Sequence, residues 1–368
     1  MRISLLLVFV ILINYSTLSQ CEGRYINEIF NNVSKTSVNY SDVYNDSYHT
    51  MDVYSPVGDS ETNRPLIIFM HGGSFYGGDK DEIDCQHFCE SFAKKGYVTA
   101  SLNYRLVGFL DIVNFLTYNA TQYEVVLKAV ADAKSAIRFF RKDYYENGNS
   151  YGIDPNTIFA GGTSAGAVIA IHLAYIDHIN DLPVIPINVQ NIVNSFGGLE
   201  GDAGNVGYSS HVNGVISFAG GINDVDWIDS YDEPLVSCQG DNDLTVNYNC
   251  GPGLNQSTVL TLCGSGEMHP KADEVGVNNS HLLFPGEAHS WFLSGNGNPL
   301  FVQALDFTTN FLYPLLPCNT TYISAISKEK ILVKSVDILG RDINEKNKNN
   351  IHLLIYSDGS VEKKMKLK

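Results

Sequence analysis

Hydrophobic positions along the chain form short apolar runs that alternate with longer segments of helical periodicity. The helical patterns are clearest at residues 123–144, 165–175 and 300–315. The apolar runs predict a small antiparallel pair followed by parallel strands, at 35–40, 48–55, 66–70, 97–102, 157–160, 212–218, 234–238 and 281–284. Strands and helices that alternate in this way indicate an α/β fold with a mostly parallel, doubly wound sheet.

The N-terminus departs from this pattern. Arg2 precedes an apolar run, residues 3–13, that is too short to span a bilayer. Such a segment is typical of an export signal, so we expect residues 1–20 to be a signal peptide and the protein to be secreted or held at the cell surface. A buried first strand is the alternative. Leu18-Ser19-Gln20-Cys21 also resembles a lipoprotein cleavage box, which leaves lipidation of Cys21 open.

The C-terminus also departs from the alternation of strands and helices. Residues 331–341, 351–359 and 361–368 predict three short strands joined by polar turns. We therefore expect one large domain at 21–318 and a short all-β tail at 319–368. The tail resembles the C-terminal sorting domain of the type 9 secretion system, which implies the secretion machinery as a partner. A small β appendage, for example one that binds carbohydrate, is the alternative. Removal of the tail after export is left open.

Charge and cysteine content narrow the class of protein. The 368 residues carry a net charge of −16, which argues against nucleic acid or an anionic membrane as a partner. Cysteines in an exported chain favour disulfides, although their pairing stays open. No C-x-x-C pair occurs, so we expect no structural zinc. The cysteines are Cys21, Cys85, Cys89, Cys238, Cys250, Cys263 and Cys318.

A candidate nucleophile lies in Gly162-Thr163-Ser164-Ala165-Gly166, between the predicted strand 157–160 and the predicted helix 165–175. Small residues around a serine allow a sharp strand-to-helix turn that exposes the hydroxyl. Upstream, His71-Gly72-Gly73 follows the apolar run 66–70. We expect the N–H groups of Gly72, Gly73 and Ala165 to form an oxyanion hole. A glycine turn that leaves a buried strand is the alternative interpretation of the upstream motif.

The serine needs an acid and a base later in the chain. Asp243 and His289 follow the predicted strands 234–238 and 281–284, in that order. We predict that Asp243 orients His289 and that His289 accepts the proton of Ser164. Asp241 is the rival acid, and Asp243 could also serve as a turn residue. Order or setting disfavours the other histidines, which are His49, His71, His87, His172, His178, His211, His269, His281 and His352.

Taken together, these motifs resemble those of the α/β-hydrolase carboxylesterases with an HGG oxyanion motif, over residues 22–318. The resemblance implies the α/β-hydrolase fold and a carboxylic ester hydrolase, lipase-like in class, that acts through an acyl-enzyme. It also implies no cofactor and no metal, and it favours Asp243 as the acid. We expect a small-molecule or polymer-linked ester as substrate, with a short acyl or aryl group.

Two other functions stay open at this stage. One is a secreted peptidase of the same fold, and the other is a catalytically idle hydrolase fold used for adhesion or binding. Two insertions, residues 107–122 and 177–213, are candidates for a cap over Ser164. The natural ester and the oligomeric state are not determined by these patterns.

Overall fold

The computed structural model describes residues 21, 23–317, 332–336, 351–356 and 361–365. Contacts within the chain divide it into two compact units, Met1–Leu316 and Pro317–Lys368. The predicted signal peptide lies outside the described residues, so it stays a prediction. Within the residues that the structure describes, no helix has the length and apolar character needed to cross a membrane.

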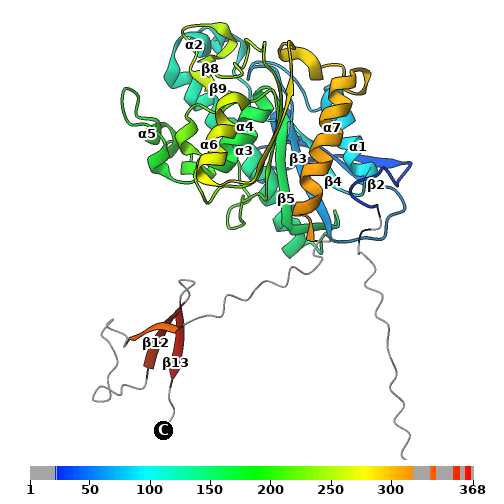
Figure 1. Cartoon of the computed structure of the whole chain (residues 1–368), viewed down its shortest axis with the longest axis vertical. Coiled ribbons are helices and arrows are strands. Elements are labelled where there is room, and N and C mark those ends of the chain that lie inside the picture. Colours follow the sequence, from blue (N-terminus) through cyan, green and yellow to red (C-terminus); the bar gives the residue numbers. More distant parts are fainter. Residues whose placement is uncertain (1–20, 22, 318–331, 337–350, 357–360, 366–368) are drawn as a thin grey trace, which may run out of the picture. The chain divides into compact units, whose positions relative to one another are not determined.

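An eight-stranded sheet forms the centre of the first unit (Figure 1). In spatial order its strands are β1 (Val33–Asn39), β2 (Thr50–Pro56), β4 (Val98–Leu102), β3 (Arg64–Met70), β5 (Ile153–Thr163), β6 (Val215–Phe218), β7 (Leu235–Gly240) and β10 (Asn279–Phe284). The pairs β1–β2 and β2–β4 are antiparallel, and the other neighbours are parallel. Each strand overlaps a strand that the sequence predicts.

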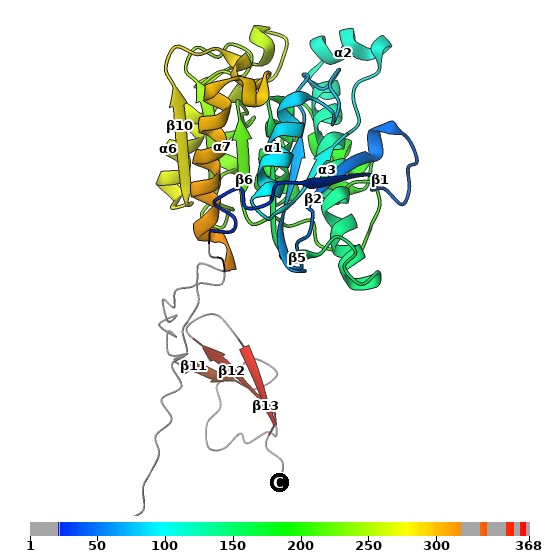
Figure 2. The same ribbon diagram turned by 90° about the vertical axis from the view of Figure 1, so that its right-hand side faces the viewer.

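Helices cover both faces of this sheet. They are α1 (Ile83–Lys94), α2 (Ile112–Thr117), α3 (Asn119–Glu146), α4 (Ala165–Tyr175), α5 (Val189–Asn194), α6 (Ser265–Val275) and α7 (Pro299–Leu312). The helices α1 and α7 lie on one face, and α3, α4 and α6 lie on the other (Figures 1 and 2). This arrangement confirms the predicted doubly wound α/β fold.

The core lies between the central strands and their helices. Every residue of β3 and of α4 is buried. Such continuous apolar burial is expected of parallel strands covered on both faces, and each fully buried Leu, Ile or Phe contributes about 1.5–3 kcal/mol. On the side of α1, Phe69 stacks on Phe88 with ring centroids 3.8 Å apart, and Phe218 packs edge-on against both.

A small hairpin, β8 (Cys250–Pro252) and β9 (Thr261–Cys263), lies outside the main sheet and is closed by a Cys250–Cys263 disulfide. The sequence did not predict these two strands. The disulfide follows the loop that carries Asp243, and it agrees with the expectation that the cysteines form disulfides. Cys85, Cys89 and Cys238 are buried free thiols, so a bridge from the α1 cysteines to Cys21 is not formed.

In the described part of the second unit, three antiparallel strands form a small sheet, in agreement with the all-β tail that the sequence predicts. They are β11 (Leu332–Val336), β12 (Ile351–Tyr356) and β13 (Val361–Met365), in the order β11-β12-β13. The domain boundary at residue 318 and the sorting role of the tail stay predictions.

Candidate active site

Ser164 occupies a strained turn between β5 and α4. Its backbone angles are φ 52° and ψ −117°, which a residue with a side chain adopts only where the surrounding structure imposes them. The N–H of Ser164 donates to the carbonyl of Phe218 on β6 at 2.8 Å. A Cβ on Gly162 would collide with the backbone of Gly166, and one on Gly166 with the carbonyl of Met70. The two glycines therefore let the strand, the turn and the helix approach closely.

A chain of hydrogen bonds joins the side chains of Ser164, His289 and Asp243, which the sequence predicts as the catalytic residues. The Nε2 atom of His289 lies 2.7 Å from Oγ of Ser164, and its Nδ1 atom lies 2.7 Å from Oδ2 of Asp243. Asp243 and Ser164 are buried, and the side chain of His289 is 14% exposed. The imidazole can thus accept a proton from the serine while the carboxylate holds its other nitrogen.

The carboxylate of Asp243 is itself fixed by backbone donors. Its Oδ1 atom accepts hydrogen bonds from the N–H groups of Thr245 at 2.8 Å and Val246 at 3.0 Å. This leaves Oδ2 for His289. Asp241, the rival acid, accepts instead from the N–H of Gly286 at 2.6 Å. Asp241 therefore ties the acid loop to the histidine loop and does not contact the imidazole.

The loop that carries His289 is braced from two sides. The N–H of Asn242 donates to the carbonyl of Glu287 at 3.0 Å, which links it to the acid loop. After His289 the chain forms a short 3-10 helix, His289–Phe292. In that helix Trp291 packs against Phe218 and Phe284, with ring centroids 5.4 and 4.8 Å away. The aromatic packing anchors the loop to the end of the sheet.

The His71-Gly72-Gly73 motif lies beside the serine. The Cβ position of Gly72 is 3.3 Å from Cβ of Ser164. Left-handed backbone angles follow at Gly73 (φ 109°), Ser74 (φ 54°) and Phe75 (φ 64°). Such consecutive strain turns backbone groups away from regular pairing. Ala165 is the first residue of α4, so its N–H has no acceptor within the helix.

The side chain of His71 packs against this loop and against Tyr104. Its ring stacks on that of Tyr104 with centroids 4.3 Å apart, and the Tyr104 hydroxyl donates to the carbonyl of His71 at 2.8 Å. The Nδ1 atom of His71 lies 2.6 Å from the carbonyl oxygen of Gly72. Burial lowers the pKa of His71, so its ring stays neutral at pH 7.

Ser164 opens into a small apolar cavity of about 70 Å³. The lining residues are Ser74, Phe75, Phe115, Gln122, Val126, Ser164, Ala165, Val168, Asn223, Thr245, Val246, Gly253, Leu254, Val259, Leu260 and Leu262. Of the two predicted caps, segment 107–122 contributes Phe115 and Gln122. Segment 177–213 contributes none, because it lines a separate cavity beside α3 and the end of α4. Of the two candidate caps, the lining of the Ser164 cavity therefore favours segment 107–122.

Sequence reasoning missed the hairpin wall of this cavity, residues 253–262. The available signal was the pair Cys250 and Cys263, which flank a segment rich in turn residues. Within the described ranges, no group of three or more His, Cys, Asp or Glu side chains is arranged to hold a metal ion.

The sheet order, the strained serine turn and the Ser164–His289–Asp243 contacts define a protein of the α/β-hydrolase class. Residues 51–258 match the BD-FAE family model, which is more than half of the chain. The protein belongs to the BD-FAE family.

Named relatives agree with this class. Gut esterase 1 of Caenorhabditis briggsae is 27% identical over 122 residues, which cover 33% of this chain and 20% of that protein. The juvenile hormone esterase of Heliothis virescens is 30% identical over 108 residues, which cover 29% of this chain and 17% of that protein. The aligned part is thus about a fifth of the length of each relative. Both relatives are named as esterases.

Solved structures confirm the fold. Thermogutta terrifontis esterase 2 superposes with a TM-score of 0.55 at 21% identity, over 76% of this chain and 93% of that chain. At this identity the likeness establishes the α/β-hydrolase fold. The roles of individual residues rest on the geometry described above.

Proposed function

We propose that the protein is a secreted serine carboxylesterase with Ser164 as its nucleophile. The observation that carries this proposal is the unbroken hydrogen-bond chain from Asp243 through His289 to Ser164, with both distances at 2.7 Å. A serine between a base and an apolar cavity suits acyl transfer.

The reaction follows from the positions of these groups. As Ser164 Oγ attacks the ester carbonyl, Nε2 of His289 takes its proton, and the buried Asp243 carboxylate stabilises the resulting imidazolium. The N–H groups of Gly72, Gly73 and Ala165 stabilise the tetrahedral oxyanion. His289 then protonates the departing alcohol, which leaves an acyl-enzyme. Water, deprotonated by His289, attacks that ester and releases the acid and free Ser164.

The cavity suggests the acyl group. Its walls are mostly aliphatic and aromatic side chains, and its volume of about 70 Å³ is small. We therefore infer a preference for esters of short acyl chains. The alcohol side of the substrate, whether small or polymer-linked, is not selected by this cavity.

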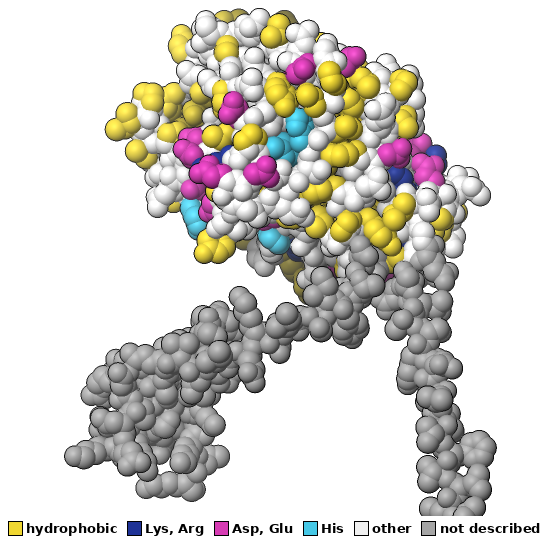
Figure 3. All heavy atoms as spheres, in the orientation of Figure 1, with side chains coloured by type: hydrophobic (Ala, Val, Ile, Leu, Met, Phe, Trp, Pro, Cys, Tyr) yellow, Lys and Arg dark blue, Asp and Glu magenta, His cyan; other side chains and the backbone are white. Residues whose placement is uncertain are grey.

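Export is a separate part of the proposal. It is supported by the apolar run at residues 3–13 and by the tail's resemblance to a sorting domain. The net charge of −16 suits a soluble protein outside the cell, and the face in view in Figure 3 carries more acidic than basic side chains. N-terminal sequencing of protein collected from the medium of the native host tests the predicted cleavage before Cys21.

Hydrolysis of p-nitrophenyl acetate, butyrate, octanoate and palmitate tests the enzymatic part. We expect activity that falls with chain length and that decreases by several orders of magnitude in Ser164→Ala. Activity that is retained in Ser164→Ala would contradict the assignment of the nucleophile. Faster cleavage of aminoacyl p-nitroanilides than of esters would favour a peptidase, and inactivity on every substrate would favour a binding protein.

A further inference from the structure

One buried amide links the hairpin wall of the acyl cavity to the helices beside it. Gln122 lies on α3, is 2% exposed and lines the cavity that contains Ser164. We propose that Gln122 is a specificity-determining residue that closes this cavity against long acyl chains. The inference deepens the proposed function and rests on it, because it concerns the acyl group that Ser164 would receive.

All four hydrogen-bonding positions of the Gln122 amide are used inside the protein. Its Nε2 atom donates to the carbonyl of Phe115 at 2.8 Å and to that of Thr258 at 3.1 Å. Its Oε1 atom accepts from the N–H of Leu260 at 2.9 Å and from Nδ2 of Asn119 at 3.1 Å. A single side chain therefore joins three segments, which are α2, α3 and the hairpin.

Those segments supply much of the cavity wall. Phe115 from α2 and Leu260 from the hairpin both line the cavity, as do their neighbours Leu254, Val259 and Leu262. The backbone bonds to Gln122 are made by Phe115 and Leu260 themselves. The amide thus fixes the residues whose apolar side chains limit the space available to an acyl chain.

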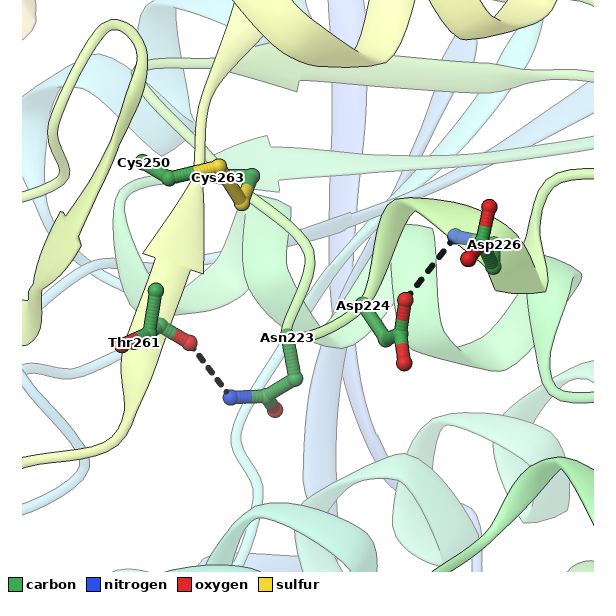
Figure 4. The surroundings of a disulfide bond; sticks show 6 residues. All are labelled: Asn223, Asp224, Asp226, Cys250, Thr261 and Cys263. Carbon is green, nitrogen blue, oxygen red and sulfur yellow. Dashed lines mark hydrogen bonds between the residues drawn. A yellow bond between two sulfur atoms is a disulfide. The ribbon is translucent and has the colours of Figure 1, made fainter.

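The base of the hairpin is secured independently of Gln122. The Cys250–Cys263 disulfide closes it, and Nδ2 of Asn223 donates to the carbonyl of Thr261 at 2.9 Å (Figure 4). The N–H of Leu254 also donates to the carbonyl of Thr245 on the acid loop at 2.8 Å. Loss of the Gln122 contacts is therefore expected to release the hairpin between residues 254 and 260 without detaching its base.

One further hydrogen bond connects the hairpin to α2. The Thr258 hydroxyl donates to the carbonyl of Leu116 at 2.7 Å, and Thr258 is exposed. This bond links the hairpin tip to α2 beside the Gln122 contacts. It offers a second, surface position at which the same connection can be weakened without a change in the buried core.

The variant Gln122→Leu removes the amide but keeps a side chain of similar size. It therefore tests the hydrogen bonds of Gln122 separately from the volume of its side chain. In Gln122→Leu the N–H of Leu260 and the carbonyls of Phe115 and Thr258 lose their partner, so these groups turn toward water and the wall opens. We expect the ratio of kcat/KM for p-nitrophenyl octanoate to that for the acetate to rise about tenfold. The change should come mainly from a lower KM for octanoate, since the reacting groups are not altered.

Two further variants make the test decisive. Thr258→Val should raise the octanoate-to-acetate ratio in the same direction by a smaller factor, about threefold, because it removes one neutral hydrogen bond. Gln190→Leu is the matched control, since Gln190 on α5 donates to the carbonyl of Leu182 at 3.1 Å and lies outside the cavity lining. Its ratio should equal that of the wild type.

The outcomes separate this inference from the proposed function. The octanoate-to-acetate ratio could be unchanged in both Gln122→Leu and Thr258→Val while the wild type shows Ser164-dependent activity. This result would overturn the role proposed for Gln122 and would not affect the proposed esterase function. If Gln122→Leu does not fold, the ratio in Thr258→Val decides. Absence of Ser164-dependent hydrolysis in the wild type would instead overturn the proposed function itself.

Discussion

Two serine–histidine pairs are hydrogen-bonded in the part of the chain that the structure describes, and their surroundings differ. In the first, Ser164 bonds His289, which bonds Asp243. In the second, Ser237 on β7 bonds Nε2 of His269 on α6, and Nδ1 of that ring lies 2.6 Å from Oδ1 of Asn279. Both sets place a serine, an imidazole and a side-chain oxygen in one hydrogen-bonded line.

Their surroundings separate them. Ser237 lies within a regular strand with no exposed surface, and a second hydroxyl, that of Ser265, donates to it at 3.1 Å. Ser164 stands on a strained turn that opens into a cavity. Asn279 offers a neutral amide where Asp243 offers a carboxylate, so no carboxylate bonds the ring of the second pair directly. The nearest one, Asp273, accepts from the amide of Asn279 at 2.8 Å. Burial also lowers the pKa of His269. Reactivity therefore follows from backbone setting, access and charge.

The comparison predicts that replacing His289 lowers activity, whereas replacing His269 mainly lowers stability. His289→Ala should lower kcat on p-nitrophenyl butyrate by about 10⁴–10⁶-fold, because the serine loses its base. His269→Ala should leave kcat within about tenfold and reduce the free energy of unfolding by about 1–3 kcal/mol, because Ser237 and Asn279 lose a buried partner. Steady-state kinetics and urea unfolding of both variants measure these effects. A catalytic loss in His269→Ala as large as that in His289→Ala would abolish the distinction.

The two aspartates of the acid loop sharpen the same point. Asp243→Asn should lower kcat by about 10⁴-fold, because an amide neither fixes the required tautomer nor stabilises the imidazolium. Asp241→Asn should lower kcat by less than about tenfold, since Asp241 accepts from a backbone N–H of the histidine loop and does not contact the imidazole. Kinetics on the same butyrate ester checks both values. The opposite order would transfer the acid's role to Asp241.

The smallest expected effect concerns the pH response of His281, which packs against the second pair. His281 stacks on His269 with centroids 5.0 Å apart, and burial together with that ring lowers the pKa of His281 to about 4. Between the unfolded pKa of about 6.5 and this value, the unfolded chain binds a proton that the native state does not. Stability should therefore be full above pH 6.5 and decrease as the pH falls toward 4.

Replacing His281 by Phe removes that titration while keeping an aromatic ring against His269. The decrease in Tm between pH 7 and pH 5 should be a few degrees smaller in His281→Phe than in the wild type. Thermal unfolding followed by circular dichroism measures the difference. An equal decrease in both proteins would mean that His281 does not contribute to the acid sensitivity.

Much of the fold was readable from local sequence. The apolar runs located all eight strands of the main sheet, and the pattern at 165–175 matched α4 residue for residue. The central elements β3 and α4 are buried along their whole length, so they appear in the sequence as continuous apolar runs. The prediction also singled out Ser164, Asp243 and His289 from their order and from the loops on which they lie. Their catalytic roles rest on the experiments described above.

Other parts depend on contacts that no local pattern reveals. The strands β8 and β9 have three residues each and are joined by a disulfide, so neither shows a periodicity of its own. Helix α6 contains Pro270 and begins beside glycines, which made its sequence resemble a loop. Gln122 reads as one polar position on a long helix, because its partner Thr258 lies 136 residues away.

Covalent labelling with a fluorophosphonate probe, followed by peptide mapping, tests the central claim most directly. The probe reacts with a serine only where a base and an oxyanion site activate it. We predict a single adduct on Ser164, with Ser237 unmodified in the same sample. An adduct on Ser237, or a fully folded protein with no adduct on Ser164, would contradict this account of the site.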